Sequence, residues 1–190
     1  MSETFFQNYS RQLQTVLASA PWEEISKLGQ DVQKCWEEGR QFFLCGNGGS
    51  AANAIHLAND YLYGIAGVLR QGMRVHALPA NSAILTCLAN DINYEQVFAE
   101  QLAVLGKAED LLLVLSGSGN SPNIIEVLKM AKKMSIKSYA ILGFSGGRSK
   151  LLADVPIHFP IQDMQIAEDI QLIVGHMIMQ FLSYETISYR

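Results

Sequence analysis

Hydrophobic positions along this chain follow two patterns that alternate from one end to the other. Where apolar residues recur every three or four positions, the spacing predicts amphipathic helices. Short, nearly continuous apolar runs that stop at glycine or polar residues predict strands instead. The predicted helices cover 3–19, 22–36, 51–63, 81–89, 94–105, 122–130 and 165–183. The predicted strands cover 42–45, 75–78, 110–116, 138–143 and 155–159.

This alternation of strands and helices predicts an α/β fold in which helices flank a doubly wound parallel sheet of five strands. The run between Asp110 and Ser116 is apolar at every position, as expected of a strand that is covered on both faces. We therefore place it at the centre of the sheet. At 190 residues the chain is expected to form a single domain, 1–190.

The first predicted strand runs into a glycine-rich turn, Gly46-Asn47-Gly48-Gly49-Ser50, and a helix-favouring segment follows. Glycines let the backbone adopt positive φ and let a ligand approach without meeting a Cβ atom. The free N–H groups and the dipole at the start of a helix favour an anion, and Ser50 is expected to cap this helix. The turn therefore predicts a phosphate-binding loop.

Other phosphate motifs fit this turn less well. Gly46 to Ala51 matches the loose dinucleotide pattern G-x-G-x-x-A, but the next predicted strand ends in Leu-Pro-Ala and offers no acid for a ribose. A nucleotide P-loop ends in Gly-Lys-Ser/Thr, and that triplet follows no glycine loop in this sequence. A turn that serves only the tight packing of a strand against a helix remains an open alternative.

A second small loop follows the central strand and contains Ser116, Ser118, Ser121 and Pro122. Ser121 suits the N-cap of the next helix, and Pro122 suits its first turn. Ligands of open α/β sheets bind beyond the carboxyl ends of the strands, where the strand order reverses, so both loops can serve one site. The three serines and nearby N–H groups then form a phosphate cradle that uses no lysine. A serine-rich turn with a helix cap is the plainer alternative.

Titratable side chains on two of the predicted helices are candidates for chemistry. His56 and Asp60 are four residues apart and so share a helix face, which suits a pair of metal ligands or an acid beside a base. A simple surface contact between the two is the alternative. Glu168 and His176 are eight residues apart, about 12 Å of helix rise, so both reach one ligand only by leaning toward each other.

Composition and charge narrow the class of protein. The net charge is −4 without a basic block, which disfavours binding to DNA or RNA. Cys35, Cys45 and Cys87 form no C-x-x-C pair, so buried free thiols are expected rather than disulfides or a thiolate zinc site. No apolar run is long enough to span a membrane, and the first residues lack the pattern of a secretory signal, so we expect a soluble cytoplasmic protein.

Five motifs taken together resemble those of the SIS (sugar isomerase) domain family, most closely its phosphoheptose isomerase branch. They are Gly-Asn-Gly-Gly-Ser at 46–50, Ala-Asn-Asp at 89–91, Ser-Gly-Ser-Gly-Asn-Ser at 116–121, Gly-Phe-Ser-Gly-Gly at 143–147 and a closing Glu-Asp…His at 168–176. The resemblance covers nearly the whole chain. It implies a single SIS domain of three-layer, flavodoxin-like form that isomerises a sugar phosphate, most closely sedoheptulose 7-phosphate, between aldose and ketose.

The resemblance also implies a homotetramer with active sites at subunit contacts. The N-terminal helices, about 1–39, would pack in this oligomer. Phe5, Phe6 and Tyr9 make the first helix rich in aromatic residues, which independently favours packing against another copy of the chain.

Most of the candidate residues acquire a role from this resemblance. The implied substrate contacts are Asn47, Gly48, Gly49, Ser50, Asn90, Asp91, Ser116, Gly117, Ser118, Ser121 and Glu168. The implied zinc ligands are His56, Asp60, Glu168 and His176. In the implied catalysis, Asp60 moves the proton between C1 and C2 and His176 shuttles protons on the oxygens, through an enediol.

Three positions depart from the family's better-known pattern, which has glutamate at 60, glutamine at 168 and threonine at 117. Asp60 draws the carboxylate back by one methylene, and Glu168 adds negative charge that would strengthen binding of a divalent metal. The departures leave the exact sugar phosphate open. The alternative is a non-catalytic SIS protein that binds a sugar phosphate or a protein partner, similar to the DnaA initiator-associating protein. The presence of His56, an acid at 60 and His176 favours the enzyme.

Overall fold

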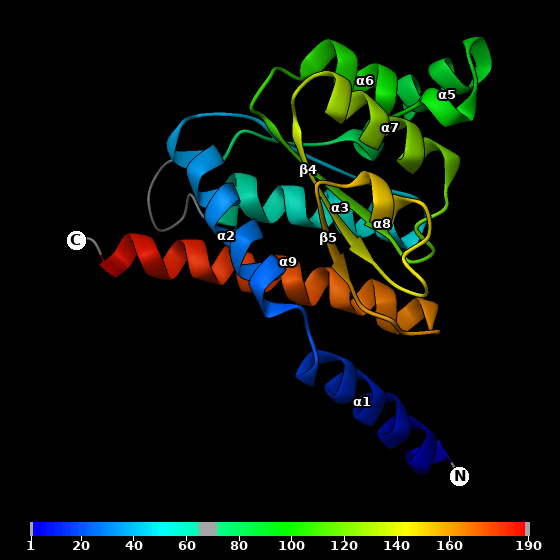
Figure 1. Cartoon of the computed structure of the whole chain (residues 1–190), viewed down its shortest axis with the longest axis vertical. Helices are drawn as coiled ribbons and strands as arrows, with labels where there is room; N and C mark the ends of the chain where they lie inside the picture. Colours follow the sequence, from blue (N-terminus) through cyan, green and yellow to red (C-terminus); the bar gives the residue numbers. More distant parts are fainter. Residues whose placement is uncertain (1, 65–71, 189–190) are drawn as a thin grey trace.

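The computed structural model describes residues 2–64 and 72–188, and a five-stranded parallel sheet lies between two layers of helices (Figure 1). The strands are β1 (Phe42–Gly46), β2 (Val75–Ala77), β3 (Leu111–Ser116), β4 (Lys137–Leu142) and β5 (Val155–His158). The α-helices are α1 (Ser2–Ala18), α2 (Trp22–Glu37), α3 (Gly49–Asn59), α5 (Ser82–Asp91), α6 (Ala99–Leu105), α7 (Pro122–Lys133), α8 (Ser149–Leu152) and α9 (Met164–Ser188). A π-helical turn, η1 (Asp60–Gly64), and the 3-10 turns η2 (Leu78–Ala80) and η3 (Tyr94–Gln96) complete the described elements. The predicted fold class is confirmed.

The strand order places the two predicted loops side by side. The sheet runs β2-β1-β3-β4-β5, and every neighbouring pair is parallel. The chain moves outward from β1 to β2 and then crosses to β3 on the other side of β1, so the order reverses between β1 and β3. Gly46 at the end of β1 pairs with Leu115 near the end of β3. The loops after these strands therefore meet at the switch point, where ligands of such sheets bind.

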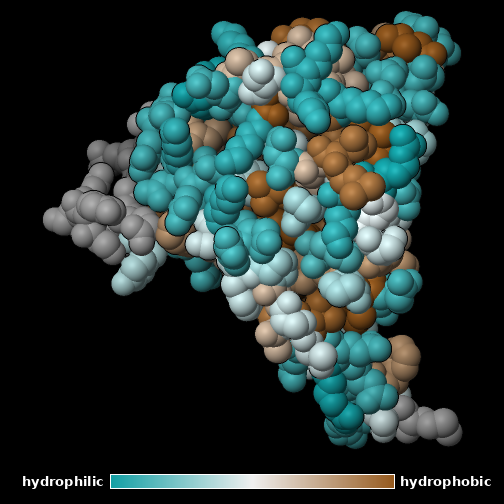
Figure 2. Space-filling view, in the orientation of Figure 1, coloured by the Kyte–Doolittle hydropathy of each residue, from teal (hydrophilic) through white to brown (hydrophobic). Residues whose placement is uncertain are grey.

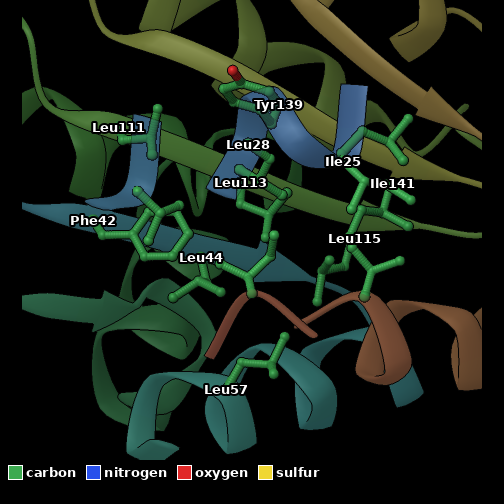
Figure 3. Close-up of a cluster of buried hydrophobic side chains, with 14 of the residues drawn as sticks. Ile25, Leu28, Phe42, Leu44, Leu57, Leu111, Leu113, Leu115, Tyr139 and Ile141 are labelled. Carbon is green, nitrogen blue, oxygen red and sulfur yellow. The ribbon is translucent and has the colours of Figure 1, made fainter. Parts of the chain in front are cut away.

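Both faces of the sheet are buried, as the continuous apolar run predicts. Leu111, Leu113 and Leu115 of β3 belong to one core, whereas Leu112 and Val114 belong to the other. Figure 3 shows the first core, where side chains of the strands meet those of α2 and α3. Burial of one leucine side chain stabilises a fold by about 1.5–3 kcal/mol, so the two cores hold the sheet in place beneath its loops.

Helices α2, α3 and α9 cover the first core, and α5, α6 and α7 cover the second (Figure 1). In the first layer, α3 and α9 are in direct contact. A Cβ atom added at Gly175 of α9 would lie 2.3 Å from Leu57 Cδ2 of α3, so glycine is what permits this spacing. The buried hydroxyl of Tyr61 donates to the Gly175 carbonyl at 2.8 Å, and burial raises the pKa of this phenol. The close contact between α3 and α9 also positions residues of the candidate site.

Helix α1 extends away from the rest of the molecule (Figure 1) and has no buried residue. Its inner side is tied to α9 by the Tyr9 hydroxyl, which donates to Asp169 Oδ2 at 2.5 Å. Two main causes raise the pKa of Tyr9 to about 12. Partial burial is the larger cause, and this hydrogen bond is the next. Phe5 and Phe6 remain 68% exposed. The expected packing of α1 against another copy of the chain stays a prediction.

Element boundaries differ from prediction mainly around the first loop. Helix α3 begins at Gly49, two residues earlier than expected, and its N-cap is Gly48 with φ +55°. The prediction that Ser50 caps the helix is therefore wrong: Ser50 lies in the first turn, and its Oγ accepts a hydrogen bond from Gln171 Nε2 at 3.0 Å. The helix predicted to reach 63 ends at Asn59 and continues as η1. The loop predicted over 64–72 lies mostly outside the described residues.

Other boundary differences lie further along the chain. The helix predicted over 94–105 is divided into η3 and α6, and α9 extends five residues beyond the expected end. Helix α8 was not anticipated, since its apolar positions are too few to show a period.

All three cysteines are free thiols, as expected, but they are not all buried. Burial raises the pKa of Cys45, and it raises that of Cys35 to about 12. Cys87 is exposed, so the expectation of a buried thiol is wrong at this position. Its Sγ donates to Asp91 Oδ2 at 3.4 Å.

The face of the molecule shown in Figure 2 is mostly hydrophilic, and its hydrophobic atoms form separate patches. Over the described ranges, no helix is both long enough and apolar enough to cross a membrane.

The α3–α9 spacing gives a first prediction. Gly175→Ala should lower the free energy of unfolding by about 1–3 kcal/mol, because the new methyl group overpacks a fixed contact. Urea unfolding would measure this. Gly29→Ala is a matched control on α2, since its Cβ would lie no closer than 3.3 Å to any side-chain atom, the nearest being Ile178 Cδ1 and Phe181 Cδ1. We expect it to change stability by less than about 1 kcal/mol. Equal losses in both variants would contradict a special role for Gly175.

Candidate active site

Each glycine of the first loop has a steric reason to be glycine. A Cβ atom at Gly46 would lie 2.6 Å from the backbone oxygen of Ser50, and Gly48 has φ +55°. A Cβ atom at Gly49 would lie 2.3 Å from Glu168 Oε2. The loop therefore brings the start of α3 against both β1 and the carboxylate of Glu168, with space restricted at Gly46 and Gly49 and the backbone conformation favouring glycine at 48.

An amide pair joins the first loop to the second. Asn47 Nδ2 donates to Asn123 Oδ1, and Asn123 Nδ2 donates back to Asn47 Oδ1, both at 2.8 Å. The Tyr94 hydroxyl also donates to Asn47 Oδ1, at 3.1 Å. Asn123 is 1% exposed, so its amide depends on this partner. The sequence predicted Asn47 but missed Asn123 and Tyr94.

The serine loop is organised around its own backbone. The Gly119 N–H donates to Ser116 Oγ at 3.1 Å, and the Asn120 N–H donates to Ser118 Oγ at 3.3 Å. Ser121 is the N-cap of α7 and Pro122 its first residue, as predicted, but the Ser121 hydroxyl makes no capping bond within the described part of the chain. This hydroxyl and the N–H groups at the start of α7 are suited to bind an anion.

Between the two loops lies a cavity of about 270 Å³. It is lined by Asn47, Gly48, Gly49, Ser50, Leu115, Ser116, Gly117, Ser118, Ser121, Met164 and Glu168. No lysine or arginine is among these described lining residues, and Glu168 is the single carboxylate. A phosphate bound here would be held by hydroxyl and N–H groups, which agrees with the lysine-free cradle predicted from the sequence.

Two amide side chains, one buried and one half-buried, connect the floor of this cavity to the next turn of α3. Gln171 Nε2 donates to Ser50 Oγ, while Asn53 Nδ2 donates both to Gln171 Oε1 and to the Glu168 carbonyl, each at 3.0 Å. Asn53 and Gln171 each follow a predicted site residue by three positions, which places them on the same helix faces. That spacing was the available signal, and sequence reasoning did not use it.

Further along, three titratable side chains from α3, from the π-helical turn η1 that continues it and from α9 converge. His56 Nε2 and His176 Nε2 are 3.0 Å apart, and each lies 3.3 Å from Asp60 Oδ2. The imidazoles are about half exposed, at 49% and 44%, whereas the Asp60 side chain is 18% exposed. The pairing of His56 with Asp60 on one helix face was predicted. His176 joins them because Gly175, the residue before it, allows α9 to approach α3 closely.

The three ligand atoms fit a zinc ion. Zinc binds histidine nitrogen at about 2.0–2.1 Å and carboxylate oxygen at about 2.0–2.2 Å in tetrahedral geometry, which separates neighbouring ligand atoms by roughly 3.3–3.5 Å. The observed separations are 3.0–3.3 Å. Two neutral imidazoles and one carboxylate are also a donor set that divalent transition metals prefer. His56, Asp60 and His176 could therefore hold such a metal and leave a fourth position open.

One predicted zinc ligand lies apart from this cluster, and two predicted substrate contacts lie apart from both the cluster and the cavity. Glu168, the fourth predicted zinc ligand, lines the cavity against Gly49 instead, about 12 Å of helix rise from His176. Asn90 and Asp91 lie exposed at the end of α5 and do not line the cavity. Two hydrogen bonds hold the pKa of Asp91 below its usual value. The one from Asn90 Nδ2, at 2.8 Å, has the larger effect, and the one from Cys87 has the smaller. Their implied role in substrate binding stays a prediction.

Comparison with known proteins bears directly on this arrangement. A family model described as the SIS domain matches residues 4–143. The chain belongs to the SIS domain family. Proteins named phosphoheptose isomerase from Clostridium acetobutylicum and Akkermansia muciniphila are 32% and 36% identical to this SIS chain. Each match spans 163 residues, 86% of this chain and 83% or 84% of the relative.

Two solved structures of proteins named phosphoheptose isomerase agree with this chain over nearly its whole length. Phosphoheptose isomerase GmhA from Neisseria gonorrhoeae has a TM-score of 0.87 and 26% identity, covering 96% of this chain and 97% of its own. A phosphoheptose isomerase from Francisella tularensis has a TM-score of 0.88 and 25% identity, covering 97% and 99%. The resemblance drawn from the loop motifs is therefore confirmed.

The position of Glu168 gives a prediction about zinc. In calorimetric titration of chelator-treated protein, we expect one zinc per chain, with His176→Ala weakening the affinity about a hundredfold or more. Glu168→Gln should change it less than about threefold, the effect of a charge roughly 10 Å away in water. His76→Ala, on β2, is the control for loss of any histidine. A loss in Glu168→Gln as large as in His176→Ala would show that Glu168 is a ligand after all.

Proposed function

We propose that this protein is an aldose–ketose isomerase that converts sedoheptulose 7-phosphate into D-glycero-D-manno-heptose 7-phosphate. One observation carries the proposal: a carboxylate and two imidazoles meet along the same pair of helices that begin at the lysine-free cavity. The curated relatives named phosphoheptose isomerase support the substrate class, because each match includes 86% of this chain.

The geometry of α3 and α9 favours a long substrate. His56 follows Gly49 by seven residues and His176 follows Glu168 by eight, so the cluster lies about 10–12 Å of helix rise beyond the cavity. In this proposal the phosphate is held by the serine loop, and the carbon chain extends along the two helices until C1 and C2 reach Asp60. A seven-carbon sugar phosphate spans this distance more completely than a shorter one.

Asp60 is the proposed base for the proton that moves between C1 and C2. Removal of this proton gives an enediol, and return of the proton to the neighbouring carbon completes the isomerisation. The shorter aspartate side chain still reaches the cluster, since its Oδ2 lies 3.3 Å from both imidazoles. His176, on the opposite helix, is the proposed group that moves protons between the two substrate oxygens.

A divalent metal, zinc in this proposal, would be held by His56, Asp60 and His176. When bound, it would polarise the substrate oxygens and stabilise the charge that develops on them. Glu168 and the three serines would contact the substrate at the other end of the site, from the walls of the cavity.

The proposal includes a homotetramer with active sites at subunit contacts and a cytoplasmic location, where phosphorylated sugars are metabolised. The exposed Phe5 and Phe6 of α1 support assembly, because apolar side chains on a projecting helix are suited to contact another subunit.

Turnover of sedoheptulose 7-phosphate by the purified protein tests the proposal. We expect activity with zinc and its loss after chelation. Asp60→Asn should lower kcat about a hundredfold or more, which is the usual contribution of a general base. Asp31→Asn is the matched control, because Asp31 pairs with Lys137 away from the cavity. Wild-type turnover in Asp60→Asn would refute the base assignment. No turnover by the intact protein would favour another sugar phosphate or a non-catalytic binding protein.

The serine loop gives a separate kinetic prediction. Ser118→Ala should raise KM about tenfold and lower kcat less, because a phosphate contact acts equally on bound substrate and transition state. Steady-state kinetics at saturating zinc would separate the two effects. Ser149→Ala, a buried serine of α8 outside the lining of the cavity, is the control. A fall in kcat without a change in KM would instead point to a role of Ser118 in the transition state.

A further inference from the structure

Gly117 and Met164 occupy one wall of the cavity and compete for the same space. Gly117 directly follows β3, and Met164 is the first residue of α9. A Cβ atom added at Gly117 would lie 2.5 Å from Met164 Sδ and 3.2 Å from Met164 Cε. Both residues line the cavity, so the thioether fills the volume that a side chain at 117 would otherwise take.

Neither backbone can easily move to relieve such a collision. The Gly117 carbonyl accepts a hydrogen bond from the Gly143 N–H at 3.0 Å, which ties it to the end of β4. The start of α9 is fixed by Asp163, whose Oδ1 accepts from the Ile166 N–H at 3.0 Å and whose carbonyl accepts from the Ala167 N–H at 3.1 Å. The flexible methionine side chain is therefore the part that must adapt.

The thioether gives this wall a character unlike the rest of the site. Most other lining residues offer hydroxyl, amide, carboxylate or backbone groups, and Leu115 is the other large apolar one. Met164 is 38% exposed, so part of it faces the open space. Glu168 follows one helical turn later, which places the thioether beside the path from the serine loop along α9.

We propose that Gly117 and Met164 act as a coupled pair that sets which sugar phosphates the cavity accepts. Glycine at 117 makes room, and the Met164 thioether contacts the carbon chain of the substrate beside its phosphate. This rests on the proposed function, since the ligand is taken to be a sugar phosphate. Apolar contacts of this size discriminate between substrates by about tenfold or more per missing or extra carbon.

A double-mutant cycle on the full-length protein tests the pair with ketose phosphates of five, six and seven carbons. Met164→Ala should raise KM for the best substrate about fivefold and reduce its preference over the next best about fivefold, with kcat nearly unchanged. Gly117→Ala should raise KM about fivefold, because its methyl group drives the thioether into the cavity. In the Met164→Ala background, the same Gly117→Ala change should alter KM less than about twofold.

Met134→Ala is the matched control, since Met134 is half-buried at the far end of α7 and does not line the cavity. Thermal unfolding of every variant checks that the changes in KM do not come from loss of folding. Two outcomes would overturn the proposal. One is that Gly117→Ala raises KM by the same factor in both backgrounds. The other is that Met164→Ala changes the substrate preference no more than the control Met134→Ala does.

Calorimetric binding of the same three ketose phosphates separates this inference from the proposed isomerase. If the wild-type protein binds these ketose phosphates but turns over none of them, the isomerase assignment fails. The double-mutant cycle is then evaluated with dissociation constants in place of KM. Coupling between positions 117 and 164 in those constants would support the pair as a binding determinant. Independent effects in binding, like independent effects on KM, would refute it.

Discussion

The close approach of α3 to α9 is the constraint on which the rest of this molecule depends. The Leu57 side chain packs against the backbone at Gly175, and a Cβ atom at 175 would lie 2.3 Å from Leu57 Cδ2, so a larger residue there would displace Leu57 or widen the gap between the helices. At this spacing Asn53 forms a hydrogen bond with Gln171. One turn further along the helices, His56 lies within hydrogen-bond distance of His176. Both the floor of the cavity and the titratable cluster are thus built by one helix pair, whose starting points are fixed by the glycine loop and by the hydrogen bonds of Asp163.

The fold could be predicted almost completely because its signals are local. Apolar runs identify strands, glycines identify the turns that follow them, and the parallel order follows from the alternation of strands and helices. The candidate site was predictable to the extent that its residues are neighbours in sequence, as in the two loops and in the His56–Asp60 pair. The boundary error at α3 had a physical reason, since Gly48 at positive φ lets the helix begin before Ser50.

What could not be predicted are the contacts between residues far apart in the chain. Asn123 lies 76 residues from its partner Asn47, and Gln171 lies 121 residues from Ser50. Spacing within one helix can place Gln171 on the same face as Glu168, but no spacing in a single sequence shows which residue of a distant segment each of these side chains contacts. The resemblance to the family supplied four implied metal ligands, and the packing of α9 decides that three of them meet while Glu168 lies at the cavity. The Gly117–Met164 contact is of the same kind, because it depends on where one helix begins relative to the end of a strand.

The cavity's lack of lysine and arginine among its described lining residues has a consequence for how ionic strength acts on the protein. Sites that hold phosphate with cations bind more weakly as salt is added, because ions screen the attraction. Here the fixed charge on the wall is the carboxylate of Glu168, which repels a phosphate. If the proposed phosphate binds here, added salt would screen this repulsion, so its affinity would be held or improved as ionic strength rises. The proposed phosphate site would therefore recognise its ligand mainly by hydrogen-bond geometry, because its described lining residues include no lysine or arginine.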